Sequence, residues 1–203
     1  MKIRLENEND YYNVENLVRE SFFNIYRPGC VEHFLLHKLR NDNNFIKDLS
    51  YILEIDDKIV GQVAFIKNNI KLKNNNDLSI LTLGPICILP TYQKQGYGKL
   101  LLDFALNKAK EKNYGAVFLE GNINFYKKSG FTFASNYHIK YHTLSDNDDS
   151  FFFLCKELKK DYLKNINGEY FVPEIYFVKE KDVEEFDKLF KYKEKKILPH
   201  QIF

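Results

Sequence analysis

The 203-residue chain contains no tryptophan, a single methionine and only three cysteines. Cys30, Cys87 and Cys155 are an odd number, lie far apart and form no C-x-x-C pair. This pattern argues against a disulfide framework and against a zinc site, and it favours a reducing cytosol. We therefore expect no metal in this protein.

Long apolar runs and charge of one sign are also missing. No uncharged apolar stretch approaches the roughly 20 residues that a membrane-spanning helix needs. The start of the chain, Met1-Lys-Ile-Arg-Leu-Glu-Asn, lacks the apolar segment of a signal peptide. A net charge of +2, with no long basic block at either end, gives no reason to expect nucleic-acid binding. We expect a soluble, cytoplasmic protein without nucleic-acid or membrane partners.

What is present is typical of a globular domain. Hydrophobic residues make up 44% of the chain and charged residues 29%, which are ordinary values for a soluble protein. The length is sufficient for one domain with a substantial core. The 14 tyrosines and 18 phenylalanines stand out. They accompany many Asn and Lys residues, so coding bias explains them better than function does.

Periodicity divides the chain into strands and helices. Alternation predicts strands at residues 2–6, 51–55 and 59–66, the last two joined as a hairpin. Helical spacing predicts a first helix capped by Asp10 and a second helix over residues 31–39. Beyond these we expect strands at 81–89, 116–119, from 131, at 151–155 and at 170–178, helices at 98–112, 122–129 and 182–192, and an acidic loop at 145–150.

The stretch from Leu81 to Leu102 is the most informative. Its first part is rich in Leu and Ile, which predicts a strand buried on both faces, and Pro90 should end that strand because proline cannot donate to a sheet ladder. After Gly96 and Gly98 the apolar residues switch to helical spacing. A strand, a glycine loop and a helix form a phosphate-binding geometry, since glycines admit an anion close to the backbone and the first N–H groups of the helix point at it.

Two other phosphate-binding loops do not fit this stretch. A Walker A loop needs Ser or Thr after the lysine, but Leu100 follows Gly98-Lys99. A dinucleotide-binding fingerprint needs a third glycine where Leu101 stands, and it belongs near the start of a domain rather than in the middle.

A third pattern fits. Gln93-x-x-Gly96-x-Gly98, after a strand that ends in Pro90, resembles the acetyl-CoA loop of the GNAT superfamily of N-acetyltransferases. Asn122 and Tyr126-Lys-Lys-Ser-Gly-Phe131 are similar to its later Asn…Tyr-x-x-x-Gly-Phe signature, and the hairpin before the central strand also matches. The ordered set covers about residues 3–133. Leu83-Gly-Pro85 and Gly121-Asn122 most resemble a bacterial branch of mostly uncharacterised acetyltransferases, although that branch tends to carry Gly-Asp-Pro where this chain has Gly121-Asn122-Ile123.

The resemblance implies an α+β fold: a GNAT-type mixed, mostly antiparallel central sheet flanked by helices and splayed at its two central parallel strands. It implies an acetyl-CoA-binding core over residues 1–135. Residues 136–203 are then C-terminal strands and a helix that complete or extend the same domain.

The resemblance also implies that acetyl-CoA, as co-substrate, lies between the strands at 81–89 and 116–119. Pantetheine would pair with the first strand as an added strand, and the pyrophosphate would lie at the helix N-terminus. Asn122 could hydrogen-bond the pantetheine, and a helix N-cap is an equally good alternative for it. The residues expected to bind the co-substrate are Ile86, Cys87, Ile88, Gln93, Gln95, Gly96, Tyr97, Gly98, Lys99 and Asn122.

Tyr126 is the expected catalytic residue. In the resemblance it stands where a tyrosine hydroxyl protonates the departing CoA thiolate, which is a role that a phenol can perform. In a chain this rich in tyrosine, a core-packed Tyr126 is the alternative. The general base is not identified; Glu120 is within reach in principle, and Glu54 and His138 are weaker candidates. Cys87 lies inside a predicted buried strand, so inert burial is favoured over a covalent acyl-enzyme.

We therefore predict an acetyl-CoA-dependent N-acetyltransferase. It would move an acetyl group to a primary amine of an unknown small-molecule or peptide acceptor by direct attack. The acceptor pocket would lie around residues 22–27 and after Phe131. Left open are a non-catalytic acyl-CoA-binding or sensor module of the same fold, a longer acyl donor, and a homodimer.

Overall fold

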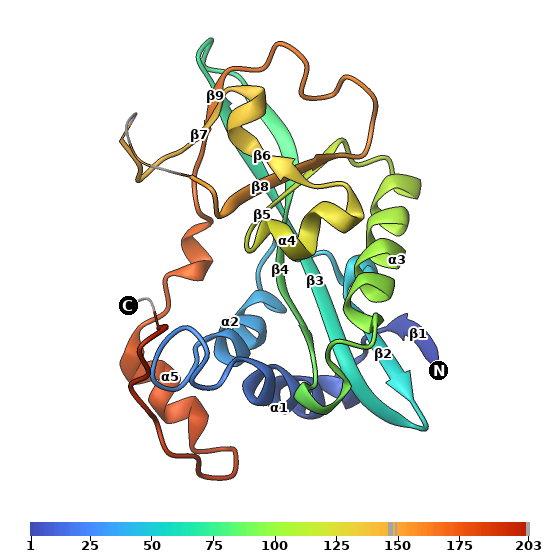
Figure 1. Cartoon of the computed structure of the whole chain (residues 1–203), viewed down its shortest axis with the longest axis vertical. Coiled ribbons are helices and arrows are strands. Elements are labelled where there is room, and N and C mark those ends of the chain that lie inside the picture. The colour runs from blue at the N-terminus through green and yellow to red at the C-terminus, as the bar shows by residue number, and fades with distance from the viewer. Residues whose placement is uncertain (146–147, 149, 202–203) are drawn as a thin grey trace.

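The computed structural model describes residues 1–145, 148 and 150–201, and a sheet runs through the whole molecule (Figure 1). Its strands are β1 (Lys2–Leu5), β2 (Tyr51–Ile55), β3 (Lys58–Leu72), β4 (Asp77–Ile88), β5 (Ala116–Glu120), β6 (Thr132–Phe133), β7 (Ile139–Tyr141), β8 (Phe153–Glu157) and β9 (Gly168–Tyr170). The main order is β1-β2-β3-β4-β5-β8-β6, and β9 pairs with both β3 and β7. The β4–β5 and β7–β9 pairs are parallel and the others are antiparallel, so the predicted mixed, mostly antiparallel sheet is confirmed.

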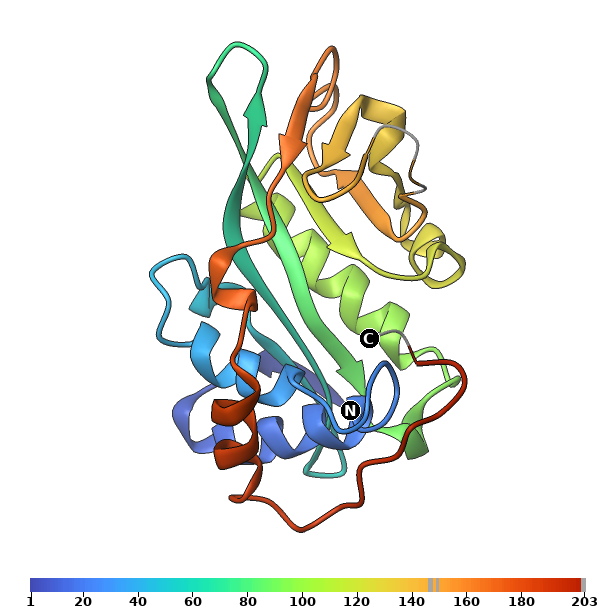
Figure 2. The ribbon, with the colours of Figure 1, turned by 90° about the vertical axis from the view of Figure 1, so that its left-hand side faces the viewer.

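Helices cover both faces of this sheet, as Figure 2 shows. They are α1 (Tyr11–Phe22), α2 (Glu32–Leu39), α3 (Tyr97–Glu111), the short α4 (Ile123–Tyr126) and α5 (Glu180–Asp187). Side chains alternate between the faces of a strand. Leu53 accordingly packs with the buried side of α3, whereas its neighbour Ile52 packs with α1 and α2. The expected α+β class is therefore confirmed, with α3 on one face and α1 and α2 on the other.

The two central parallel strands part soon after they meet. β4 pairs with β5 only at Leu81–Val117 and Thr82–Phe118, although β4 continues to Ile88. Across the other edge of β4, Phe65 pairs with Leu83 and Val63 with Ile86, so two residues of β4 lie opposite Ala64 alone. Such a β-bulge bends its strand and re-aims the residues that follow. The splay that the resemblance implied is present.

Asp10 does not cap α1 as predicted. Its carboxylate accepts hydrogen bonds from Arg4 Nη1 (2.6 Å) and Nη2 (2.8 Å), and also from the backbone N–H of Asn7. Asn7 caps the short 3-10 turn that precedes α1, and no side chain caps α1 itself. The prediction was wrong because an arginine from β1 competes for the carboxylate, and local sequence does not reveal that partner.

The C-terminal third differs most from the expected elements. The strand expected over 170–178 is β9, which ends at Tyr170, and a 3-10 turn at Glu174–Tyr176 follows Pro173. Proline lacks the N–H that a strand would need to continue. β7 was not expected, β8 begins two residues later than predicted, and α5 replaces the helix expected at 182–192. Of the acidic loop expected at 145–150, residues 146, 147 and 149 lie outside the described residues.

Candidate functional site

The end of β4 and the start of α3 form an open backbone cradle. Gly96 immediately precedes α3 in the left-handed region at φ +89°, where glycine is favoured, and a Cβ placed there would meet no atom within 4 Å. No acidic side chain lies in the first turn of α3. That turn contains Tyr97, Gly98 and Lys99. N–H groups in such a turn lack intrahelical acceptors and favour an anion. The geometry therefore suits a phosphate.

Side chains of the preceding loop hold the cradle in shape. Gln93 Nε2 donates to the carbonyl of Ile88 at 2.9 Å, and Gln95 Nε2 donates to the carbonyl of Thr91 at 3.2 Å. The ammonium of Lys99 pairs with Asp103 one turn along the helix. Gln93 and Gln95 therefore stabilise the loop, and the side chain of Lys99 lies along α3.

The residues expected along β4 lie where its edge toward β5 has no strand partner among the described residues. Ile86 packs toward the α3 face, whereas Cys87 packs toward α1 and α2. Burial raises the pKa of Cys87 to about 12, and Ser21 nearby lowers it by less. A thiol held protonated is a poor nucleophile, so the geometry gives Cys87 no covalent role.

The short helix α4 brings Tyr126 next to the cradle. A Cβ on Gly98 would lie 3.2 Å from the ring of Phe125, whose centroid is 4.9 Å from that of Tyr126. On its other side Tyr126 lies over Gly121, where a Cβ would come within 2.4 Å of the ring. Glycine at 121 thus provides the space in which the tyrosine sits. Phe125 was not among the expected site residues; its position directly before Tyr126 is a signal that could have found it.

Tyr126 is half-buried, and its hydroxyl has no hydrogen bond within the part of the chain that the structure describes. Burial raises the pKa of Tyr126 well above its ordinary value, and the nearby Tyr26 adds to the increase. The phenol therefore stays protonated over the whole neutral range. It is available as a donor to a group placed beside it.

Asn122 is the N-cap of α4. Its side-chain oxygen accepts the backbone N–H of Asn124 at 2.9 Å, which is the N-cap alternative of the two that the sequence left open. This bond orients the start of α4 and hence Tyr126.

A carboxylate lies at the far end of the diverging strands. Glu120, the last residue of β5, accepts a hydrogen bond at 2.8 Å from the hydroxyl of Tyr141, the last residue of β7. Burial raises the pKa of Glu120, while the Tyr141 bond lowers it by less. Thr82 pairs with Phe118, so Glu120 is level with Gly84 across the gap, and Tyr176 donates to the Gly84 carbonyl at 3.2 Å.

The other base candidates lie elsewhere. Glu54 is bound by Arg4, at 2.6 Å from Nη2, on the edge pair β1–β2. His138 follows the turn after β6 in a left-handed conformation and lines a different hollow. Of the aromatic residues near the expected acceptor pocket, Phe23 is buried, and Tyr137 is bonded to Glu157. Tyr26 remains half exposed beside Phe22.

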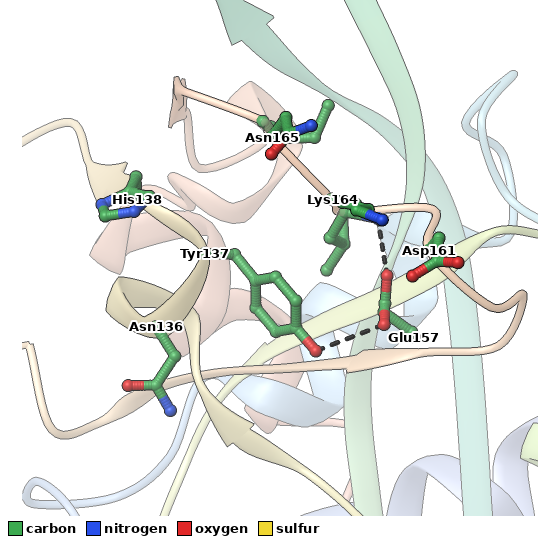
Figure 3. Close-up of a pocket in the computed structure, with 9 residues that line it drawn as sticks. Asn136, Tyr137, His138, Glu157, Asp161, Lys164 and Asn165 are labelled. Carbon is green, nitrogen blue, oxygen red and sulfur yellow. Dashed lines mark hydrogen bonds between the residues drawn. The ribbon is translucent and has the colours of Figure 1, made fainter.

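A separate hollow of about 340 Å³ lies between the turn after β6 and the loop after β8 (Figure 3). Its central carboxylate, Glu157, is already used: Oε2 accepts from the Tyr137 hydroxyl at 3.3 Å and Oε1 from the Leu163 N–H at 2.6 Å. His138, a weaker base candidate, lines this hollow, whereas Tyr126 and the residues expected to bind the co-substrate do not.

Comparison with known proteins defines the class. The model of the acetyltransferase (GNAT) family matches residues 11–131, and the chain belongs to this family. The resemblance drawn from the glycine loop and the Asn…Tyr-x-x-x-Gly-Phe signature is therefore confirmed.

Individual relatives give a finer comparison. The chain is 26% identical over 140 residues to an uncharacterised N-acetyltransferase of Escherichia coli, YhbS, covering 69% of this chain and 78% of that protein. The crystal structure of YhbS in complex with CoA matches with a TM-score of 0.72, over 86% of this chain and 91% of that one. A GNAT family acetyltransferase from Brucella melitensis, in complex with acetyl-CoA, is 20% identical and matches with a TM-score of 0.68 over 87% and 97% of the two chains. At that identity it shows the fold alone.

Within residues 1–145, 148 and 150–201, no helix is long and apolar enough to cross a membrane. In the same residues, no three His, Cys, Asp or Glu side chains gather in a way that would hold a metal ion.

Proposed function

We propose that this protein transfers an acetyl group from acetyl-CoA to a primary amine by direct attack in a ternary complex. One observation carries the proposal: the cradle, the end of β4 and the helix of Tyr126 meet at Gly98. A Cβ placed on Gly98 would lie 3.6 Å from the side chain of Ile88 in β4 and 3.2 Å from the ring of Phe125 in α4. Relatives that share this fold are described in complex with CoA or acetyl-CoA.

Donor binding would follow this succession. The pyrophosphate would accept hydrogen bonds from N–H groups between Gln95 and Lys99, with Gly96 providing the close approach. Pantetheine would add to the β4 edge along Ile86, Cys87 and Ile88 through main-chain hydrogen bonds. Asn122 would act through its cap on α4, and the thioester would then lie between Tyr126 and the splay.

Chemistry would need one group at the sulfur and one at the amine. The amine nitrogen forms a bond to the thioester carbonyl carbon, the C–S bond breaks, and the thiolate receives a proton or hydrogen bond from Tyr126. The proton that the amine loses is assigned to Glu120, because its raised pKa brings the carboxylate closer to the basicity that a general base needs. The acceptor class, small molecule or peptide, is left to the assay.

The test is acetyl-CoA-dependent release of CoA with a panel of amines. Tyr126→Phe should lower kcat by about 10²-fold, the lower end of typical acid–base contributions, and should leave acetyl-CoA affinity by calorimetry unchanged. Tyr114→Phe is the matched control, because Tyr114 is also half-buried but lies in the turn after α3. An unchanged rate in Tyr126→Phe would remove Tyr126 from the mechanism.

Two other outcomes separate the alternatives. Tight acetyl-CoA binding without turnover of any amine would identify a non-catalytic acyl-CoA-binding or sensor module. A preference for propionyl- or succinyl-CoA over acetyl-CoA would identify a different acyl donor.

A further inference from the structure

The chain after α5 returns to the loop between the first two helices. We call residues 23–31 the α1–α2 loop and residues 188–201 the C-terminal segment. Figure 2 shows this segment, in red, running past the blue α1–α2 loop. The family model ends at residue 131, so the segment lies outside the part of the chain that defines the family.

Asn24 connects the two. Its Oδ1 accepts hydrogen bonds from the N–H of Gly29 at 2.8 Å and of Lys196 at 3.0 Å, while its Nδ2 donates to the carbonyl of Glu194 at 3.0 Å. The Asn24 carbonyl in turn accepts from Gln201 Nε2 at 3.0 Å. One residue therefore closes the α1–α2 loop on itself and fastens it to the C-terminal segment at three points.

Charged side chains extend this attachment along α1. Lys193 pairs with Glu20 at 2.9 Å and lies 4.9 Å from the ring centroid of Phe23. Arg19, which is fully buried, donates to both carboxylate oxygens of Asp187 and to the carbonyl of Lys191. The segment thus contacts the loop and α1 at several points, while Tyr192 and Ile197 stay exposed.

The opposite side of the same loop faces the proposed site. Ser21, in the last turn of α1, donates to the Ile88 carbonyl at 3.3 Å, so the loop begins beside the proposed pantetheine edge. The ring of Tyr26 is tilted against that of Phe22 at 6.2 Å between centroids, and Tyr26 is close enough to influence the pKa of Tyr126. The α1–α2 loop therefore contacts the C-terminal segment through Asn24 and lies near Tyr126 through Tyr26.

We propose that the C-terminal segment fixes the shape of the α1–α2 loop that receives the acceptor amine, and that Asn24 is the positioning residue through which it acts. The inference rests on the proposed function, because an acceptor exists only if acetyl transfer occurs. It predicts that loosening this attachment weakens acceptor binding and leaves donor binding intact, since the cradle and the β4 edge make none of these contacts.

The test uses the full chain with Asn24→Gly. Asn24 has φ +61°, which glycine adopts without strain, so this change removes the side-chain bonds and keeps the backbone conformation. Asn75→Gly is the matched control: Asn75 has φ +63° and lies in the turn between β3 and β4. Gln201→Ala loosens the attachment from the segment's side without altering the loop sequence.

Asn24→Gly should raise the acceptor KM by about tenfold, the equivalent of one or two lost hydrogen bonds. Its acetyl-CoA affinity and the kinetics of Asn75→Gly should match wild type, and Gln201→Ala should show a smaller rise. Hydrogen exchange should show lost protection at the Gly29 and Lys196 amides of Asn24→Gly.

An unchanged acceptor KM in Asn24→Gly, or an equal rise in the KM of acetyl-CoA, would overturn the proposal. If wild type acetylates no amine, the proposed function fails instead. Hydrogen exchange then still tests the attachment, and unchanged protection of the two amides would refute it.

Discussion

A substitution at Gly96 can affect ligand binding without disturbing the packing of the fold. The sequence predicted that a side chain at Gly96 and at Gly98 would hold the phosphate away, but the two positions differ. At Gly98 a Cβ would press on Phe125 at 3.2 Å, whereas at Gly96 it would meet nothing within 4 Å. Substitution at Gly98 therefore disturbs packing, and substitution at Gly96 reports on whatever lies in the open cradle.

Gly96→Asp should therefore weaken acetyl-CoA binding without unfolding the protein. A carboxylate within about 5 Å of a phosphate costs on the order of 2–4 kcal/mol at an effective dielectric constant of 20, which is tenfold or more in affinity. Asn tolerates the left-handed region almost as well as Asp. Gly96→Asn is therefore the neutral control and should lose much less affinity. Calorimetry gives both affinities, and equal losses in the two variants would refute the charge argument.

At the scale of elements, the sequence predicted correctly those features that depend on residues adjoining in the chain. The strand ending at Pro90, the glycine turn and α3 adjoin in sequence, and so do β5, Gly121 and α4; all are present nearly as expected. Side-chain partners from other elements were missed. Tyr141 of β7 donates to Glu120 of β5, although these strands are not neighbours in the sheet. Arg4 of β1 binds Asp10 in the turn that follows, which the helix-capping pattern does not reveal.

The hydrogen bond from Tyr141 of β7 to Glu120 of β5 leads to a prediction for the proposed base. Burial raises the pKa of Glu120 and the Tyr141 hydrogen bond partly lowers it, so the carboxylate loses its charge at a higher pH than a free glutamate does. Activity that depends on the ionised form should fall as pH drops through this raised pKa. Tyr141→Phe removes the lowering contact and should move the acid limb of kcat/KM to still higher pH.

The measurement needs a weakly basic acceptor amine, so that deprotonation of the amine itself does not mask the limb. Glu120→Gln should lower kcat by about 10²-fold or more and abolish the limb. Glu169→Gln serves as a control, because the half-buried Glu169 of β9 pairs with His142 and is not part of the proposed site. A limb that survives in Glu120→Gln would assign the proton acceptor to another group or to water.

At the scale of the whole molecule, one buried polar junction joins the family core to the C-terminal addition. His33 of α2 is fully buried, with Nδ1 3.4 Å from the Cys30 thiol and Nε2 3.2 Å from a carboxylate oxygen of Asp187 in α5. The Nε2 contact is within ion-pair distance but lies outside hydrogen-bond geometry. The rings of Phe186 and Phe190 enclose the imidazole at 5.4 and 5.5 Å. A protonated His33 would therefore gain too little from its neighbours to offset the cost of burying its charge.

Burial lowers the pKa of His33 from its ordinary 6.5 to about 4, while Asp187 opposes the decrease and Arg19 adds to it. The unfolded chain then binds more protons than the folded one between these two values. The contribution of His33 to the free energy of unfolding should therefore be fully present above about pH 6.5. It should be lost progressively as the pH drops toward 4. At 1.36 kcal/mol per pKa unit, His33 alone accounts for about 2–3 kcal/mol between pH 7 and 4.5.

His33→Phe tests this dependence, because a phenyl ring keeps the aromatic packing and removes the titration. Urea unfolding at pH 7, 6, 5 and 4.5 should show that wild type loses about 2–3 kcal/mol more than His33→Phe over this range. The exposed His142→Gln should follow wild type, since its imidazole pairs with Glu169 at the surface, where such pairs contribute little. If the free energy of unfolding changes with pH in the same way for wild type and His33→Phe, then His33 takes up its proton without loosening the junction. The attachment of the C-terminal addition would then not depend on a neutral imidazole.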